Sequence, residues 1–171
     1  MTSALQLETE RLLLAAFTPE LTAAVREGQD AEGLIGAEIP PGWPDDELRG
    51  LLALYANWLR DVPSVVGFGP WIIVERAGNA VVGSAGFVGK PNQEGSIELG
   101  FGVHPGHRNR GYASEAARAL VRWGLEQPGV DRVVATCDQD NIPSMRVLEK
   151  AGLVRLGEED GQLRWETRRP Q

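Results

Sequence analysis

The stretch from Val103 to Gly124, VHPGHRNRGYASEAARALVRWG, decides the fold of this chain. A histidine-, arginine- and glycine-rich turn leads directly into an alanine-rich helical pattern that begins near Gly111. The first-turn N–H groups of such a helix have no partner within it, and the helix dipole adds partial positive charge there, so the end attracts phosphate. Arg108 and Arg110 add charge-assisted donors. The stretch predicts an anion-binding turn, although a surface loop with a helix-starting glycine is the simpler alternative.

Composition limits what the anion can belong to. The chain has 171 residues, which suits one domain spanning residues 1–171. Its 17 basic and 24 acidic residues give a formal charge of -7, which argues against a nucleic-acid binder. The single cysteine, Cys137, permits no intrachain disulfide. No secretory leader or membrane-length apolar run is recognisable, so we expect a soluble, cytoplasmic protein that does not bind membranes.

Apolar patterning predicts a mixed α+β fold. Extended apolar runs bounded by turn residues indicate strands at 10–17, 70–76, 81–88, 96–103 and 130–137, with a strand, turn and strand over 153–169. Helical spacing and cap signals indicate helices at 18–26, 46–61, 113–127 and 142–152. The strands between 70 and 103 read as an antiparallel meander. We therefore expect one mixed, mostly antiparallel sheet covered by helices.

Other site motifs fail on this sequence. The segment GSAGFVGKP lacks both the first glycine and the final hydroxyl residue of a P-loop, because Ser84 and Pro91 occupy those positions. There is no dinucleotide-binding glycine pattern between a strand and a helix, and no nucleophile elbow. His104 and His107 stand alone without metal-ligand spacing, so no metal is expected.

The hexapeptide Arg108–Ala113 fits the signature [Q/R]-x-x-G-x-[G/A] of the GNAT superfamily of N-acetyltransferases. The segment NIPSMRVLEKAGL, at 141–153, resembles a second conserved segment of that family, and LETERLLL, at 7–14, resembles its RimJ/RimL-like branch. The best-known members of that branch acetylate the N-terminal amines of ribosomal proteins. These motifs occur in the family's order along nearly the whole chain.

The resemblance implies a twisted sheet with helices on both faces, in which two central strands splay apart and accept acetyl-CoA. Gly100 and Gly102 inside ELGFGV are consistent with such a distortion, because glycines within a strand often mark a bulge or the close approach of another backbone. The residues expected to bind the cofactor are Gly102, Val103, Arg108, Asn109, Arg110, Gly111, Tyr112, Ala113, Asn141 and Ser144.

Acetyl transfer to an amine requires a base for the ammonium, a donor for the oxyanion and a proton for the departing thiolate. By resemblance Glu98 is the candidate base, with a structural carboxylate as the alternative. A backbone N–H near Phe101 or Gly102 would stabilise the oxyanion. Many relatives use a tyrosine as the acid, but this chain has Leu148 there, which leaves Ser144 as the candidate, or only as a helix cap or cofactor contact.

The acceptor is expected to be a peptide or small-molecule amine. The loop and helix over 36–61 correspond to the family's acceptor wall. Its carboxylates would attract a cationic amine, and its aromatics could line a pocket. Alternatively, Asp45 and Asp46 complement the helix N-terminus and the aromatics belong to the core. The carboxylates are those of Glu38, Asp45 and Asp46, and the aromatics are Trp43, Tyr55 and Trp58. Two further alternatives stay open: a catalytically silent CoA-binding sensor, suggested by Leu148, and a homodimer, suggested by resemblance.

Overall fold

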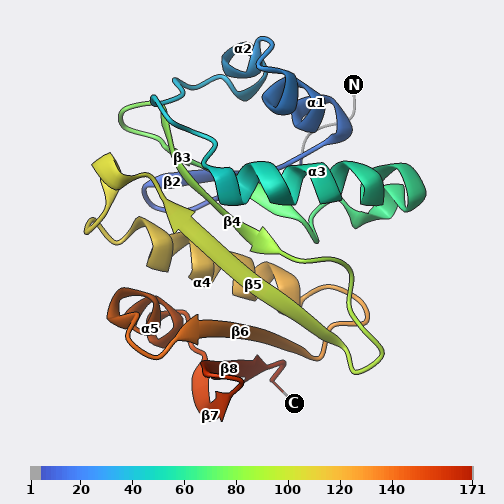
Figure 1. Ribbon diagram of the computed structural model, residues 1–171, viewed down its shortest axis with the longest axis vertical. Coiled ribbons are helices and arrows are strands. Elements are labelled where there is room, and N and C mark those ends of the chain that lie inside the picture. Colours follow the sequence, from blue (N-terminus) through green and yellow to red (C-terminus); the bar gives the residue numbers. More distant parts are fainter. Residues whose placement is uncertain (1–4, 171) are drawn as a thin grey trace.

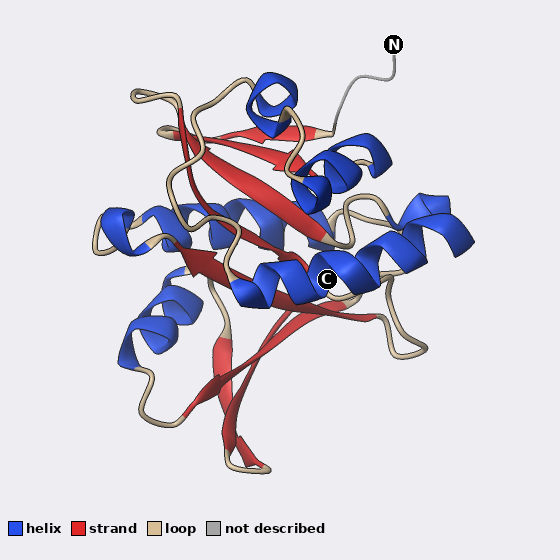
Figure 2. Cartoon of the chain, turned by 45° about the horizontal axis from the view of Figure 1, so that its top comes forward, coloured by secondary structure: helices blue, strands red, loops and turns tan. Residues whose placement is uncertain are grey.

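The computed structural model describes residues 5 to 170 and contains one eight-stranded sheet with helices on both faces (Figures 1 and 2). The strand order is β1-β2-β3-β4-β5-β6-β8-β7. Every neighbouring pair is antiparallel except β5 and β6, which are parallel and connected by a helix. The predicted mixed, mostly antiparallel sheet is thus confirmed.

In order along the chain, the elements form a β-hairpin, three helices, a three-stranded meander, a helical crossover to the next strand, a fifth helix and a final β-hairpin. The strands are β1 (Gln6–Glu8), β2 (Leu12–Ala16), β3 (Pro70–Glu75), β4 (Ala80–Phe87), β5 (Ser96–Val103), β6 (Arg132–Asp138), β7 (Val154–Glu159) and β8 (Gln162–Arg168). The helices are α1 (Pro19–Glu27), α2 (Ala31–Ile35), α3 (Asp46–Asp61), α4 (Tyr112–Leu125) and α5 (Ile142–Lys150), with short 3-10 turns at Pro63–Val65 and Pro105–His107.

Two apolar cores lie on opposite faces of the sheet. On β3, Ile72 and Val74 pack with the residues of α1 and α3, whereas Trp71 and Ile73 pack on the side of α4. Both faces of this strand are therefore covered, which explains its unbroken apolar run. At the other end of the molecule, β6, β8 and β7 lie far from α1 and α2 (Figure 1). In residues 5–170, no helix is both long enough and apolar enough to cross a bilayer.

The helix ends follow the expected caps. Thr18 accepts a hydrogen bond from the Leu21 N–H at 3.1 Å, and Asp45 accepts one from the Leu48 N–H at 2.8 Å. Gly152 follows α5 with a φ of 93°, a left-handed conformation that suits glycine. Two elements were not predicted: α2, which lies in the glycine- and proline-rich segment, and β1, which pairs with β2 as a short hairpin.

The central feature of the sheet is the divergence of β5 from β6. β5 pairs with β4 over its second half, from Leu99 to Val103, but it pairs with β6 only over Ser96 to Glu98. Beyond the rung that pairs it with Glu98, β6 pairs with β8 alone. The predicted splayed pair of strands is present, and the opening between them lies next to the start of α4.

The close approach of β4 to β5 requires Gly83. A Cβ at this position would lie 2.2 Å from the Gly102 carbonyl oxygen and 2.9 Å from the Val103 Cα, both of which are backbone atoms. By contrast, a Cβ at Gly100 would meet nothing within 4 Å. The two glycines therefore serve different purposes: one allows the strands to pack, and the other leaves space beside the strand.

We predict that Gly83→Ala lowers the free energy of unfolding by about 1–3 kcal/mol, because the added methyl forces the two strands apart. The matched control is Gly100→Ala, which should change it by less than about 0.5 kcal/mol. Chemical denaturation followed by circular dichroism measures both values. Equal stability of the two variants would contradict the packing role of Gly83.

Candidate functional site

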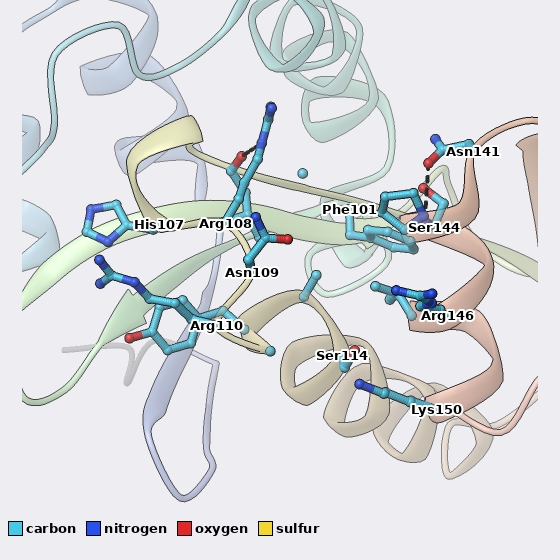
Figure 3. Close-up of a pocket in the computed structure, with 17 residues that line it drawn as sticks. Phe101, His107, Arg108, Asn109, Arg110, Ser114, Asn141, Ser144, Arg146 and Lys150 are labelled. Carbon is cyan, nitrogen blue, oxygen red and sulfur yellow. Dashed lines mark hydrogen bonds between the residues drawn. The ribbon is translucent and has the colours of Figure 1, made fainter.

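A cavity of about 710 Å³ lies where β5 and β6 diverge. Its lining comes from the end of β5, from the loop and first turn of α4, and from α5 (Figure 3). All ten residues predicted to bind the cofactor line it: Gly102, Val103, Arg108, Asn109, Arg110, Gly111, Tyr112, Ala113, Asn141 and Ser144. Residues 40 positions apart in the sequence are thus brought to one cavity. Their individual roles stay predictions.

The edge of β5 that faces this cavity has main-chain groups without a strand partner. The Val88 N–H bonds the Glu98 carbonyl at 3.2 Å and the His104 N–H bonds the Val82 carbonyl at 2.7 Å, so the even-numbered residues of β5 bond to β4. The N–H and C=O groups of Phe101 and Val103 therefore point to the opposite edge, where β6 has departed. Of the two main-chain N–H groups considered for the oxyanion, that of Phe101 lies on the cavity edge of β5 and that of Gly102 lies on the β4 edge.

The loop before α4 is shaped by two residues in left-handed conformation. Asn109 has a φ of 65° and Gly111, the N-cap of α4, has a φ of 80°. The first hydrogen bond of the helix joins the Glu115 N–H to the Gly111 carbonyl at 3.1 Å. Within residues 5–170, the N–H groups of positions 112 to 114 donate no hydrogen bond. These three donors and the helix dipole give this helix end free N–H groups and partial positive charge, and the binding of an anion there stays a prediction.

Tyr112 contributes differently from what its place in the motif suggests. Its ring is only 7% exposed and packs in the apolar core, and its hydroxyl donates a short hydrogen bond to the Glu75 carboxylate on β3. That bond lowers the pKa of Glu75 and raises the pKa of Tyr112. Only the main-chain N–H of Tyr112 is therefore available to a bound anion.

The arginines of the loop have separate tasks. The Arg108 Nε donates to the Val103 carbonyl at 3.0 Å, which fixes this side chain to the end of β5. The Arg110 carbonyl accepts a hydrogen bond from the Arg11 guanidinium at 2.7 Å. Both Arg108 and Arg110 are exposed and line the cavity, so a ligand there meets positive charge on its β5 side.

Arg11 belongs to a cluster that sequence reasoning missed. Its Nε bonds the Glu115 carboxylate at 2.7 Å, its main-chain N–H bonds the same carboxylate at 2.9 Å, and Thr9 donates a third bond. Its guanidinium also stacks on the Tyr112 ring at 4.7 Å from the centroid. The signal was present in LETERLLL, which attracted notice only as a family resemblance.

The far wall of the cavity is α5. Asn141 caps this helix by accepting a hydrogen bond from the Ser144 main-chain N–H at 3.2 Å, so Asn141, not Ser144, is the helix cap. The Ser144 hydroxyl forms no hydrogen bond with any residue of the described chain, and Ser144 lines the cavity. Arg146 and Lys150, one turn apart, line it further along the helix (Figure 3). These two cations were not predicted.

Leu148 does not line the large cavity. Its side chain is 1% exposed and packs among the core residues on the α4 side of the sheet.

Two smaller cavities open on the α3 side of β5. One, of about 220 Å³, lies between β4, β5 and the start of α3, and the other, of about 330 Å³, lies beside the loop over residues 41–45. Gly102 lines both of them and the large cavity as well. The three spaces thus meet at a single residue of β5, where glycine leaves the strand uncovered.

The residues predicted for an acceptor wall separate in the structure. Trp43 lines the 330 Å³ cavity and Asp45 lines both small cavities, whereas Glu38, Asp46 and Trp58 line neither. Glu47, which was not predicted, faces the 220 Å³ cavity. Tyr55 is a core residue: it is fully buried, and its hydroxyl bonds the Phe17 carbonyl at 2.8 Å. Tyr55 therefore agrees with the second interpretation given above, in which the aromatics belong to the core.

Glu98 lies on the same face of β5 as Gly100 and Gly102, because side chains alternate along a strand. It is exposed, and its cross-strand neighbour Val88 lines the 220 Å³ cavity. Within residues 5–170, no side-chain hydrogen bond engages its carboxylate. Glu98 itself lines neither the large cavity nor either of the two small ones.

His104 connects two loops. The His104 Nδ1 accepts a hydrogen bond from the Gly106 N–H at 3.2 Å, so its Nε2 carries the proton and donates to the Pro41 carbonyl at 2.9 Å. The loop before α4 is thereby tied to the loop before α3. Among the described residues, no three His, Cys, Asp or Glu side chains group in a way that could hold a metal ion.

A family model described as an acetyltransferase (GNAT) domain matches residues 11–154. The chain belongs to the GNAT family of acetyltransferases. It is 36% identical over 149 residues to the N-acetyltransferase YjdG of Bacillus subtilis (strain 168), covering 86% of this chain and 89% of that protein. GNAT domains use acetyl-CoA as acetyl donor, which agrees with the resemblance seen in the sequence.

Solved GNAT structures share the fold. A GNAT-family acetyltransferase from Bacillus anthracis superimposes with a TM-score of 0.64 at 25% identity, covering 96% of this chain and 99% of that chain. The ribosomal L7/L12 α-N-protein acetyltransferase RimL, solved in complex with coenzyme A, superimposes with a TM-score of 0.65 at 16% identity, covering 94% and 95%. The second match supports the fold alone.

The cluster around Glu115 predicts a pH dependence of stability. Burial raises the pKa of this carboxyl, but the hydrogen bonds from Thr9 and Arg11 together outweigh it and hold the pKa below its usual value of 4.5. A lowered carboxyl pKa stabilises the fold above the unfolded value and loses that contribution as the pH falls through the folded value.

We therefore predict that Glu115→Gln lowers the free energy of unfolding by about 0.5–1.5 kcal/mol at pH 7. The difference from the wild type should shrink as the pH falls below about 4.5. Urea denaturation at several pH values measures it. Glu126→Gln, at an exposed position at the end of α4, is the control and should show no such trend. A difference that stays constant down to pH 3 would contradict the assignment.

Proposed function

We propose that this GNAT domain transfers the acetyl group of acetyl-CoA directly to a primary amine that enters from the α3 side of β5. The observation that carries the proposal is the meeting of the cavities at Gly102. One large, basic cavity and two small cavities with carboxylates in their walls open onto the same stretch of β5. Such an arrangement lets two substrates approach one point from opposite sides.

The residues of the large cavity fit coenzyme A. The unpaired N–H and C=O groups of Phe101 and the N–H of Val103 match the amides of a pantetheine arm, as an added strand would. The N–H groups at 112–114 and the left-handed turn at Gly111 suit a diphosphate. Arg146 and Lys150 extend the positive wall for a further phosphate.

When bound, acetyl-CoA supplies an activated acyl group as a thioester. Glu98, on the face of β5 that the acceptor reaches, would take a proton from the incoming ammonium, directly or through water. The Phe101 N–H, which has no strand partner, would donate to the developing negative charge on the acyl oxygen. The Ser144 hydroxyl, which lines the cavity, would supply a proton to the departing sulfur and take one from the nitrogen of the collapsing tetrahedral intermediate, so that the hydroxyl is restored.

The walls of the 220 Å³ cavity favour an acceptor in which a cationic amine is attached to an apolar group. Asp45 and Glu47 provide carboxylates, and Leu48, Leu51 and Val88 provide apolar surface in the same cavity. An ammonium group attached to a hydrocarbon chain satisfies both. A protein N-terminal amine, as in the name of the RimL relative, and a small primary amine both meet this description.

A silent CoA-binding module is the second candidate function. The observation that favours it is Leu148, which is buried in the core at the position where many relatives have a tyrosine acid. This candidate predicts coenzyme A binding without turnover, whereas the enzyme requires both.

We predict that acetyl-CoA at about 100 times its dissociation constant adds roughly 2.7 kcal/mol to stability and raises the unfolding midpoint by about 5–10 °C. Thermal unfolding with increasing acetyl-CoA measures this, and release of free thiol with a panel of amines and peptides measures transfer. Thiol release above background with any amine supports the enzyme, and a shift without release supports the silent module. No shift at millimolar acetyl-CoA would refute both.

Single substitutions test the two catalytic candidates. We predict that Glu98→Gln lowers kcat/KM by about 10²–10⁴-fold and removes the acidic limb of its pH profile, because a general base contributes about that much. Ser144→Ala should lower kcat by at least about tenfold while the dissociation constant of coenzyme A stays within about threefold. Turnover within twofold of the wild type in either variant would remove that residue from the mechanism.

A further inference from the structure

Arg11 lies in the tight turn between β1 and β2, yet its side chain contacts the start of α4, about a hundred residues later in the sequence. Three groups there engage it: the Glu115 carboxylate, the Arg110 carbonyl and the Tyr112 ring. A Cβ at Gly111 would lie 3.2 Å from its Nη2. Arg11 therefore contacts the segment from Arg110 to Glu115 from the side opposite the large cavity, which residues 110 to 114 of this segment line.

The same contacts pair the negative charge of Glu115 at the start of α4. Glu115 is the acidic residue in the first turn of α4. An uncompensated carboxylate there would repel a diphosphate and cancel part of the helix dipole. In the structure, the Glu115 carboxylate is bonded by the Arg11 Nε, the Arg11 main-chain N–H and the Thr9 hydroxyl, so its charge is paired on the side away from the cavity.

We infer that Arg11 is a positioning residue of the coenzyme A site: it holds the Arg110–Glu115 turn in its anion-binding conformation and neutralises Glu115. The inference rests on the proposed binding of coenzyme A in the large cavity. It assigns to the N-terminal segment LETERLLL a task in cofactor binding, carried out through other residues and without contact to the thioester or the amine.

A neighbouring arginine provides a matched control. Arg76, after β3, donates to the Thr9 carbonyl at 3.0 Å and thus braces the same turn between β1 and β2. Within the described chain, its side chain bonds only this turn and does not reach residues 110–115. Removing Arg76 loosens the hairpin, whereas removing Arg11 also leaves Glu115 uncompensated.

The test measures coenzyme A binding to the full chain by isothermal titration calorimetry. Arg11→Ala should weaken binding roughly tenfold, because it places an unpaired carboxylate in the anion-binding turn. Arg11→Lys should lose less, because it keeps the charge but cannot bond the carboxylate and the carbonyl as a fork. Arg76→Ala should stay within about twofold of the wild type. Where turnover is measurable, Arg11→Ala should raise the KM for acetyl-CoA with little change in kcat.

A double-mutant cycle with Glu115→Gln separates the inferred role from a general loss of structure. If Arg11 acts by compensating Glu115, its removal should weaken binding much less in the Glu115→Gln background than in the wild type. Amide hydrogen exchange at 108–115 without ligand should increase in Arg11→Ala and not in Arg76→Ala.

Three outcomes would each overturn the inference. Arg11→Ala could weaken coenzyme A binding equally in the wild-type and Glu115→Gln backgrounds, Arg11→Ala could bind as the wild type does, or Arg76→Ala could weaken binding as much as Arg11→Ala. If Arg11→Ala does not fold, Arg11→Gln with and without Glu115→Gln completes the same cycle, because glutamine also removes the positive charge. A wild-type chain that fails to bind coenzyme A would refute the proposed function, and with it the site that Arg11 serves; a failure of the inference alone requires wild-type binding.

Discussion

The separation of β5 from β6 is the constraint on which the rest of this structure depends, because it exposes main-chain groups that a sheet would otherwise pair. The two strands share only the rungs from Ser96 to Glu98. Beyond them, Phe101 and Val103 present donors and acceptors to a cavity instead of to a neighbouring strand. An unpaired strand edge is usually a liability. Here the start of α4 and the start of α5 enclose it and turn it into a binding surface.

The second feature is a local region of positive charge in an acidic protein. With a formal charge of -7, the protein as a whole does not attract anions at long range, so the proposed binding of an anion depends on local positive charge. The structure concentrates it at one helix end, through N–H groups at 112–114, the exposed Arg108 and Arg110, and Arg146 and Lys150 across the cavity. The left-handed conformation of Gly111 orients these N–H groups, and the turn between β1 and β2 bonds to the residue before Gly111.

Glycine links the two sides of the site. Gly83 allows β4 to approach β5 closely, and Gly100 and Gly102 leave the α3 face of β5 uncovered. Because the three cavities share Gly102, the strand is thin at the place where the proposed acetyl donor and amine would meet. Charge is divided in the same way: arginines and a lysine line the large cavity, and Asp45 and Glu47 line the 220 Å³ cavity.

Sequence by itself determined all helices and strands except α2 and β1, and it located most of the residues that line the large cavity. Caps at Thr18, Asp45 and Asn141 and the glycine at 111 act on neighbours a few residues away, so local patterns were sufficient to place them. The motif order also determined the family. Tertiary structure decided which members of a motif face the large cavity. Tyr112 turned its ring into the core. The main-chain groups left without a strand partner proved to be those of Phe101 and Val103, of which the Val103 carbonyl is bonded by Arg108, because strand register depends on partners elsewhere in the chain. It also decided that Tyr55 is core and that Glu47 faces a cavity, and it brought Arg11 to Glu115, since contacts across a hundred residues follow from packing and leave no local pattern.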